Sequence, residues 1–286
     1  MSIRRPSYLL TIAGTISCLF TSAAFAQAPT ATAPAAADQP AADLPAAKVI
    51  LEKYIEAIGG RAKLETIKSR QSTITMDIAA MGMKADISLL QAEGGKFLNI
   101  SDIPSMGKVE QGSNGTTFWE NSPMAGPRLL EGPELAMTRR TSALNAELNY
   151  EKLFKKIETV GIEAVNDRPH YKVALTPEEG APMFQFFDKE TGLISKTAMT
   201  MQMQMGEMAV ESFISDYREV DGVKLPFSTS QKVQGVEMKM TVKEVKNNVE
   251  IPADKFNLPA DIKALTEKPK VAPAPPAPPT EPKKGG

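Results

Sequence analysis

The chain has 286 residues, of which 42% are hydrophobic and 23% charged, with 33 Lys and Arg against 34 Asp and Glu. This near balance gives no sign of the strongly basic surface that a polyanion such as nucleic acid attracts. A single cysteine, Cys18, and a single histidine, His170, exclude a disulfide framework and the zinc motifs that need two histidines.

The first 26 residues have the pattern of a secretory signal peptide. Arg4-Arg5 precedes an uncharged, mostly apolar run over 8–20, and Ala24-Phe25-Ala26 supplies the small residues before a cleavage site. We expect cleavage after Ala26. The exported chain would lack Cys18 and carry 31 basic against 34 acidic residues, a net charge of about −3.

Two segments have compositions that do not support a packed core. Residues 27–46 consist mainly of Ala, Pro and Thr, and residues 267–286 are proline-rich and basic. We expect a disordered linker and a disordered tail that favours extended polyproline conformations. The tail is either a solubilising extension or a segment that contacts an envelope protein.

Residues 47–266 have the size of one domain, which opens with a helix. Gly59-Gly60 ends this helix, and 61–67 adds a short second one. The apolar residues of the first helix recur at helical spacing: Ala47, Ile50, Leu51, Tyr54, Ile55 and Ile58.

After Lys68 the pattern alternates, as in β-strands with glycine-containing turns. A helical insertion over 134–145 and 150–156 interrupts the strands. The expected strands are 72–80, 84–91, 96–101, 107–111, 116–121, 157–165, 170–176, 183–188, 193–205, 208–220, 225–234 and 237–249. So many strands with short connections favour a mainly β (α+β) fold, one large curved sheet or open barrel of about a dozen strands, with helices covering its concave face.

The segment 197–205, TAMTMQMQM, carries the clearest functional signal. Met199, Met201, Met203 and Met205 alternate with polar residues, so one face of the expected strand is lined with methionine. Unbranched, polarisable methionine adapts to ligands of irregular shape. The same stripe is also typical of a sheet core packed under helices.

The sequence contains no catalytic signature. It has no nucleophile elbow, phosphate loop or dinucleotide motif, and His170 follows Arg168-Pro169 with no nucleophile motif beside it. We therefore expect no enzyme activity, no cofactor and no metal. An enzyme that uses carboxylates or Tyr217 is the least favoured alternative.

Three stretches resemble a known family. They are 50–69 (ILEKYIEAIGGRAKLETIKS), 115–135 with its tryptophan strand, and the late strands from Phe187 to Pro226 with an Asp-Gly turn. Together they are similar to bacterial outer-membrane lipoprotein-sorting or carrier-like proteins of the LolA/LolB-like superfamily. The resemblance implies a half-open antiparallel β-barrel that helices close over a cavity for acyl chains.

On this interpretation the chain is a periplasmic binding protein that holds the acyl chains of a lipid or lipoprotein in an apolar cavity, with transport or sorting to the outer membrane as its expected role. An envelope sensor or scaffold with the same fold is the alternative. Arg128 is expected to latch the lid or to meet a ligand head group. The expected cavity wall comprises Ile87, Leu89, Phe97, Trp119, Phe184, Phe186, Met199, Met201, Met203, Met238 and Met240.

Overall fold

The computed structural model describes residues 44–104, 106–203, 206–233 and 235–267; over 201–207 it describes no side chains. The expected signal peptide, nearly all of the linker and almost the whole tail lie outside these residues. No helix in the described ranges is long and apolar enough to span a bilayer.

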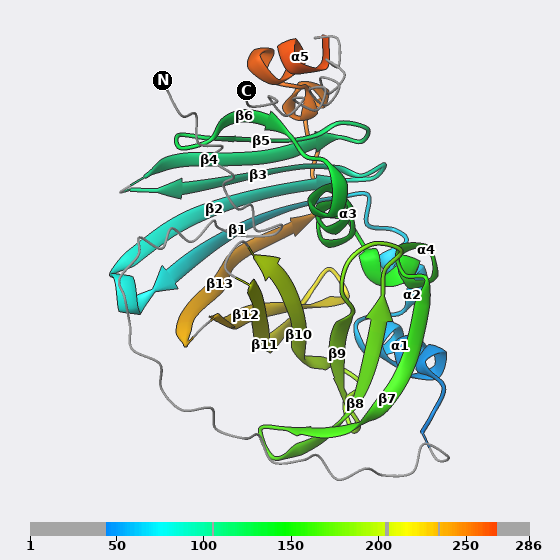
Figure 1. The fold of residues 1–286 in the computed structure, drawn as a ribbon. Coiled ribbons are helices and arrows are strands. Elements are labelled where there is room, and N and C mark those ends of the chain that lie inside the picture. Colours follow the sequence, from blue (N-terminus) through cyan, green and yellow to red (C-terminus); the bar gives the residue numbers. More distant parts are fainter. Residues whose placement is uncertain (1–43, 105, 204–205, 234, 268–286) are drawn as a thin grey trace, which may run out of the picture.

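One antiparallel sheet of 13 strands forms the body of the molecule (Figure 1). The strands are β1 (Ser69–Ile78), β2 (Met83–Ala92), β3 (Lys96–Ile103), β4 (Gly107–Asn114), β5 (Phe118–Ser122), β6 (Gly126–Leu129), β7 (Lys156–Val165), β8 (Arg168–Thr176), β9 (Met183–Asp188), β10 (Ile194–Met203), β11 (Gly206–Val220), β12 (Val223–Val233) and β13 (Val236–Asn247).

The strand order is β6-β5-β4-β3-β2-β1-β13-β12-β11-β10-β9-β8-β7. Two runs of consecutive strands are therefore joined where β1 pairs with β13, and β6 and β7 are the edges. Because β6 does not pair with β7, the sheet curves without closing. This confirms the expected half-open barrel.

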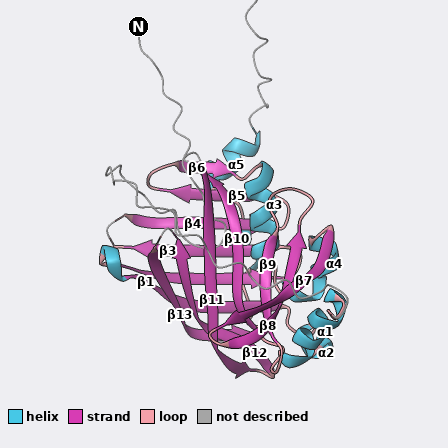
Figure 2. Cartoon of the chain, turned by 60° about the horizontal axis from the view of Figure 1, so that its bottom comes forward, coloured by secondary structure: helices cyan, strands magenta, loops and turns pink. Residues whose placement is uncertain are grey.

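The helices are α1 (Ala47–Ala57), α2 (Arg61–Leu64), α3 (Gly132–Thr141), α4 (Tyr150–Leu153) and α5 (Ala260–Glu267), with single 3-10 turns η2 (Ala79–Met81), η3 (Ala146–Asn149) and η4 (Ala253–Phe256). The segment containing α3, η3 and α4 connects the two edge strands. Figure 2 shows α1 to α4 gathered along one side of the curved sheet.

Helix α1 packs its apolar stripe against the sheet. Ile50 and Leu51 are buried with Val173, Leu175 and Phe187 of β8 and β9. Gly59 ends the helix region at φ 128°, and a Cβ there would lie 2.4 Å from the Gly222 carbonyl oxygen. Glycine is therefore required where the end of α1 meets the β11–β12 turn.

Candidate functional site

Strand alternation and register divide the sheet into two faces. The face on which α1 and α3 pack is here called the inner face. Residues that pair across neighbouring strands share a face, so Ile74, Met76 and Ile78 of β1 belong to it. In β1 the residues between them, such as Thr75 and Asp77, belong to the outer face. The same assignment extends from strand to strand through the paired residues.

An apolar cluster lies on the inner face where β13, β1, β2 and β3 pair. Its described members come from strands and from Met106 in a turn, and none comes from a helix. We call these residues the methionine cluster: Met76, Ile78, Ala85, Ile87, Ile103 and Met238 are buried, and Ile74, Met83, Met106, Val109, Val236 and Met240 are half-buried around them. Ile87, Met238 and Met240, all predicted wall residues, are thus brought together.

Met199, the first residue of the expected methionine stripe, also belongs to the inner face. Met199 pairs with Met183 of β9 and with Val210 of β11, and it is half-buried. The register continues with Met201 opposite Met208, a buried residue of β11. The side chains of Met201 and Met203 lie outside the described part of the structure.

Leu89 and Phe97 continue the inner face under α3. A second buried cluster consists of Phe97, Phe118 and Leu130. Leu89 of β2 and Leu135 of α3 pack against it. Leu89 follows Ile87 on the inner face of β2, so this cluster adjoins the methionine cluster. Helix α3 therefore covers the sheet beside the proposed cavity wall.

Three predicted wall residues lie on the outer face. Trp119 alternates with Phe118 and packs on Gly112, where a Cβ would lie 2.7 Å from the indole Cζ2. Phe184 and Phe186 alternate with the inner-face residue Phe187. The structure does not bring these three residues together with the methionine cluster.

Lysine side chains cover the two phenylalanines of β9. Lys172 Nζ lies 5.0 Å from the Phe184 ring centroid and 5.4 Å from that of Phe186, and Lys196 Nζ lies 4.9 Å from the Phe186 ring. The ammonium groups lie over the ring faces as cation–π contacts, and they also pair with Glu163 and Glu211. Phe186 is therefore buried although it is on the outer face.

Arg128 connects α3 to the sheet. Its Nη1 and Nη2 donate to Glu134 of α3 at 2.8 and 2.6 Å, and its Nη2 also lies 3.3 Å from Glu120 of β5. Burial raises the pKa of Glu120, and Arg128 opposes that shift. At the other end of α3, Gln91 donates to the Ser142 carbonyl at 2.9 Å. Hydrogen bonds from Arg128 and Gln91 thus hold the two ends of this helix. Arg128 is the residue predicted as a latch.

A polar network lies between the helices and the sheet, and sequence reasoning missed it. Tyr217 of β11 lies near Tyr54 of α1 and donates to the Ile194 carbonyl at 3.0 Å, and Tyr150 of α4 donates to Gln185 of β9 at 3.0 Å. Burial raises the pKa of all three tyrosines, and the nearby Glu147 carboxylate adds to the shift. The sequence places Tyr54 in the apolar stripe of the first helix, but nothing in it indicates that Tyr150 and Tyr217 lie close by.

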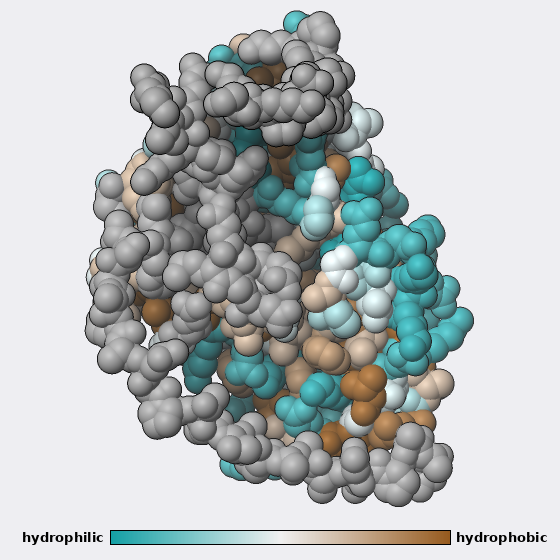
Figure 3. All heavy atoms as spheres, in the orientation of Figure 1, coloured by the Kyte–Doolittle hydropathy of each residue, from teal (hydrophilic) through white to brown (hydrophobic). Residues whose placement is uncertain are grey.

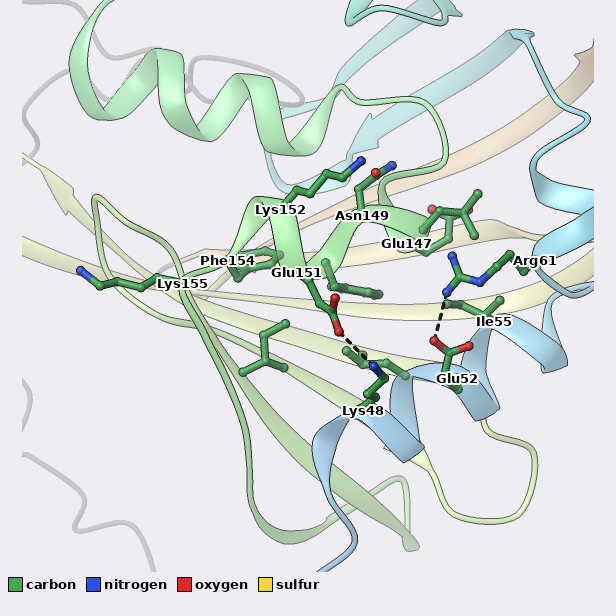
Figure 4. Close-up of a pocket in the computed structure, with 14 residues that line it drawn as sticks. Lys48, Glu52, Ile55, Arg61, Glu147, Asn149, Glu151, Lys152, Phe154 and Lys155 are labelled. Carbon is green, nitrogen blue, oxygen red and sulfur yellow. Dashed lines mark hydrogen bonds and ion pairs between the residues drawn. The ribbon is translucent and has the colours of Figure 1, made fainter.

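An open groove of about 460 Å³ separates α1 from η3 and α4 (Figure 4). Figure 4 shows Lys48 directed at Glu151, 3.4 Å away, and Arg61 at Glu52, 3.0 Å away. Ion pairs at its rim make the groove a polar surface feature. In the space-filling view hydrophilic residues likewise cover the outside of α3 and α4, and more apolar atoms lie over the adjoining strands (Figure 3).

His170 is a buried outer-face residue. Its Nδ1 lies 2.8 Å from the Arg168 carbonyl, and its Nε2 lies 3.7 Å from an Asp188 carboxylate oxygen. That carboxylate also pairs with Arg168 at 2.8 Å and accepts the Thr191 and Glu190 amides. These contacts fix the β9–β10 turn. No group of acidic, His or Cys residues in the described ranges is arranged to hold a metal.

The comparisons agree on the fold. No protein-family model matches the sequence, and no curated protein matches it. Among solved structures, LolA superfamily protein NE2245 from Nitrosomonas europaea is similar with a TM-score of 0.52 and 14% identity, over 75% of this chain and 99% of that chain.

Two further structures share the architecture. A putative outer membrane lipoprotein-sorting protein domain from Vibrio parahaemolyticus gives a TM-score of 0.52 at 13% identity, over 74% of this chain and 97% of that one. A DUF1329 family protein from Desulfovibrio piger gives 0.53 at 12% identity, with the same coverage. The chain therefore has a LolA-like fold.

Proposed function

We propose that this chain, which has a LolA-like fold, binds the acyl chains of a lipid or lipoprotein on the inner face of its half-barrel. The observation that carries the proposal is the methionine cluster, a large apolar surface built by strands beside helix α3. Burial of each methylene contributes about 0.8 kcal/mol, so a long chain would bind without a specific polar contact.

Entry of a chain requires side chains to move. Buried members of the methionine cluster expose 5% of their surface or less. Methionine has three rotatable bonds and repacks easily, and α3 is held by few contacts. We propose that displacement of α3 and rearrangement of methionines open the space, with Arg128 acting as the latch.

The proposal includes a periplasmic location, no catalytic step and handover of the ligand between membranes. The expected signal peptide over 1–26 supports the location. The structural likeness to the putative lipoprotein-sorting domain from Vibrio parahaemolyticus supports handover. Mass spectrometry of the periplasmic fraction tests the location, with a mature chain that begins at Gln27 as the expected result.

Solvent extraction of the purified full-length protein, followed by mass spectrometry, tests binding itself. We expect co-purified acyl lipid, and saturable uptake of a fluorescent fatty acid by the extracted protein. A protein that carries no lipid and takes up no fatty acid contradicts the proposal. Affinity capture with and without 267–286 tests whether the proline-rich tail contacts an envelope protein.

A further inference from the structure

The inner face changes in polarity along its strands. In β1 it begins with Arg70 and Ser72 and continues with Ile74, Met76 and Ile78. Arg70 pairs with Gln91 of β2 on one side and with Asn247 of β13 on the other. A polar row next to the helices therefore leads into the methionine cluster on the same three strands.

Arg70 carries an unsatisfied hydrogen-bond donor in this row. Its Nε donates to Asn247 Oδ1 at 2.9 Å, but the Nη2 atom is buried and has no hydrogen-bond partner among the described residues. Glu147 is the carboxylate that acts on this guanidinium, and among the described residues the two form no ion pair. A buried cationic donor without a partner is destabilising.

The surroundings do not neutralise this charge. Burial lowers the pKa of Arg70, so desolvation outweighs the effect of its neighbours. Burial likewise raises the pKa of Glu147, which favours its neutral form. The groups that face this region are Tyr54 of α1, Tyr150 of α4 and Tyr217 of β11.

From these observations we infer that Arg70 binds the anionic head group of an acyl ligand whose chain runs along β1 into the methionine cluster. The inference deepens the proposed function and rests on it. The head group is an oxyanion, either a carboxylate or a phosphate monoester, because a guanidinium donates in parallel to two oxygens of such a group.

The distance between Arg70 and the methionine cluster restricts the ligand to long chains. Met76 lies six positions after Arg70, which at about 3.3 Å per residue is about 20 Å along the strand. A chain of the length of palmitate spans that distance, whereas octanoate reaches only part of it. Arg70 would thus fix one end of the ligand and the methionine cluster the other.

The test measures binding of palmitate, its methyl ester, octanoate and palmitoyl lysophosphatidic acid to the extracted full-length protein. The ester keeps the chain and removes the charge. We expect palmitate to bind about tenfold more tightly than the ester, in the range of a charged hydrogen bond, and more tightly than octanoate. The lysophosphatidic acid arm decides which oxyanion is preferred.

Arg70→Gln should reduce palmitate affinity about tenfold and leave the affinity for methyl palmitate unchanged. Arg70→Lys should retain part of the preference for the acid. Arg61→Gln is the control, because Arg61 is an exposed residue paired with Glu52. The wild-type comparison of acid and ester needs no variant and so does not depend on variant folding.

Three results would overturn the inference. Equal binding of palmitate and its ester by the wild type contradicts a role for the head group but leaves the acyl-binding function standing. Equal weakening of both ligands by Arg70→Gln shows a structural role only. Absence of binding by all four ligands would contradict the proposed function as well.

Discussion

Gly112 shows how a single residue fixes the position of a side chain on the outer face. The only tryptophan, Trp119, lies so close to Gly112 that a Cβ would meet three indole atoms at 2.7, 2.9 and 3.1 Å. Because the ring is buried, it has little room to move. Glycine is therefore a packing requirement at this position of β4.

Gly112→Ala should destabilise the fold by about 1–3 kcal/mol, as overpacking of a filled site does. Urea denaturation followed by Trp119 fluorescence measures both the free energy of unfolding and the altered environment of the ring. Gly161→Ala is the matched control, because a Cβ at Gly161 of β7 would meet nothing within 4 Å. Equal stability of the two variants would contradict this account of the Trp119 contact.

The stability of the fold should depend on pH through the Glu147 carboxyl. Its folded-state pKa is raised above the unfolded value, chiefly by burial. The stability that this group contributes is present below the unfolded pKa and is lost as pH rises through the folded pKa. Because glutamine does not titrate, Glu147→Gln removes this loss of stability at high pH.

We therefore expect Glu147→Gln to melt at a higher temperature than the wild type at about pH 8, and the difference to shrink towards about pH 4. Thermal unfolding by circular dichroism measures the difference. Glu151→Gln, in the exposed part of the same segment, should leave the melting temperature unchanged. A Glu147→Gln protein that is less stable at the higher pH would show that the carboxylate is stabilising.

At the scale of elements, α3 has the features of a mobile cover. Of its 10 residues only Thr138 is buried, whereas α1 buries Ala47, Ile50, Leu51 and Ile55. The contacts that hold α3 are Leu135 on the Phe97 cluster, the ties of Arg128 and Gln91, and Arg139 over the Phe118 ring. Elements with few buried contacts open first.

Arg128→Ala should loosen α3 without unfolding the sheet. We expect faster amide exchange over 132–141 with unchanged exchange in β1. The free energy that holds α3 on the sheet should fall by about 1.5–3 kcal/mol, since a hydrogen bond to a charged group contributes that much. Hydrogen exchange with mass spectrometry resolves the two segments. Arg218→Ala, which breaks an exposed pair with Asp216, is the control. Unchanged exchange in α3 would contradict the latch.

The sequence was informative where alternation is regular. It located twelve of the 13 strands to within a few residues, because glycine-containing turns separate the segments in which apolar and polar residues alternate. It missed β6, which has four residues including Gly126 and Pro127, and the eight-residue α5. Short elements carry too few residues for a periodic signal.

The face of each strand could not be predicted from alternation alone. Phe118-Trp119 and Phe186-Phe187 are adjacent large residues, so either member of each pair could face the helices. Register decides the choice, and an irregularity between Ile194 and Lys196 changes the alternation in β10. Alternation alone therefore does not reveal that the predicted wall residues Trp119, Phe184 and Phe186 lie on the outer face.

In the whole molecule, helix α3 belongs to the segment that joins the two edge strands of the sheet. Since α3, η3 and α4 link the edge strands β6 and β7, the segment that bridges the open side of the sheet is also the one that lies beside the methionine cluster. A shift of α3 therefore changes access to the inner face without breaking strand pairing. This arrangement suits a protein that takes up and releases a long apolar ligand.

Methyl NMR of protein labelled at the methionine methyl groups shows whether an acyl chain binds at the methionine cluster. On titration with palmitate we predict shifts for Met76, Met83, Met238 and Met240 of the methionine cluster, and none for Met124, which is 48% exposed in the β5–β6 turn. Saturable binding that leaves the cluster methyls unchanged would place the ligand elsewhere and contradict the account.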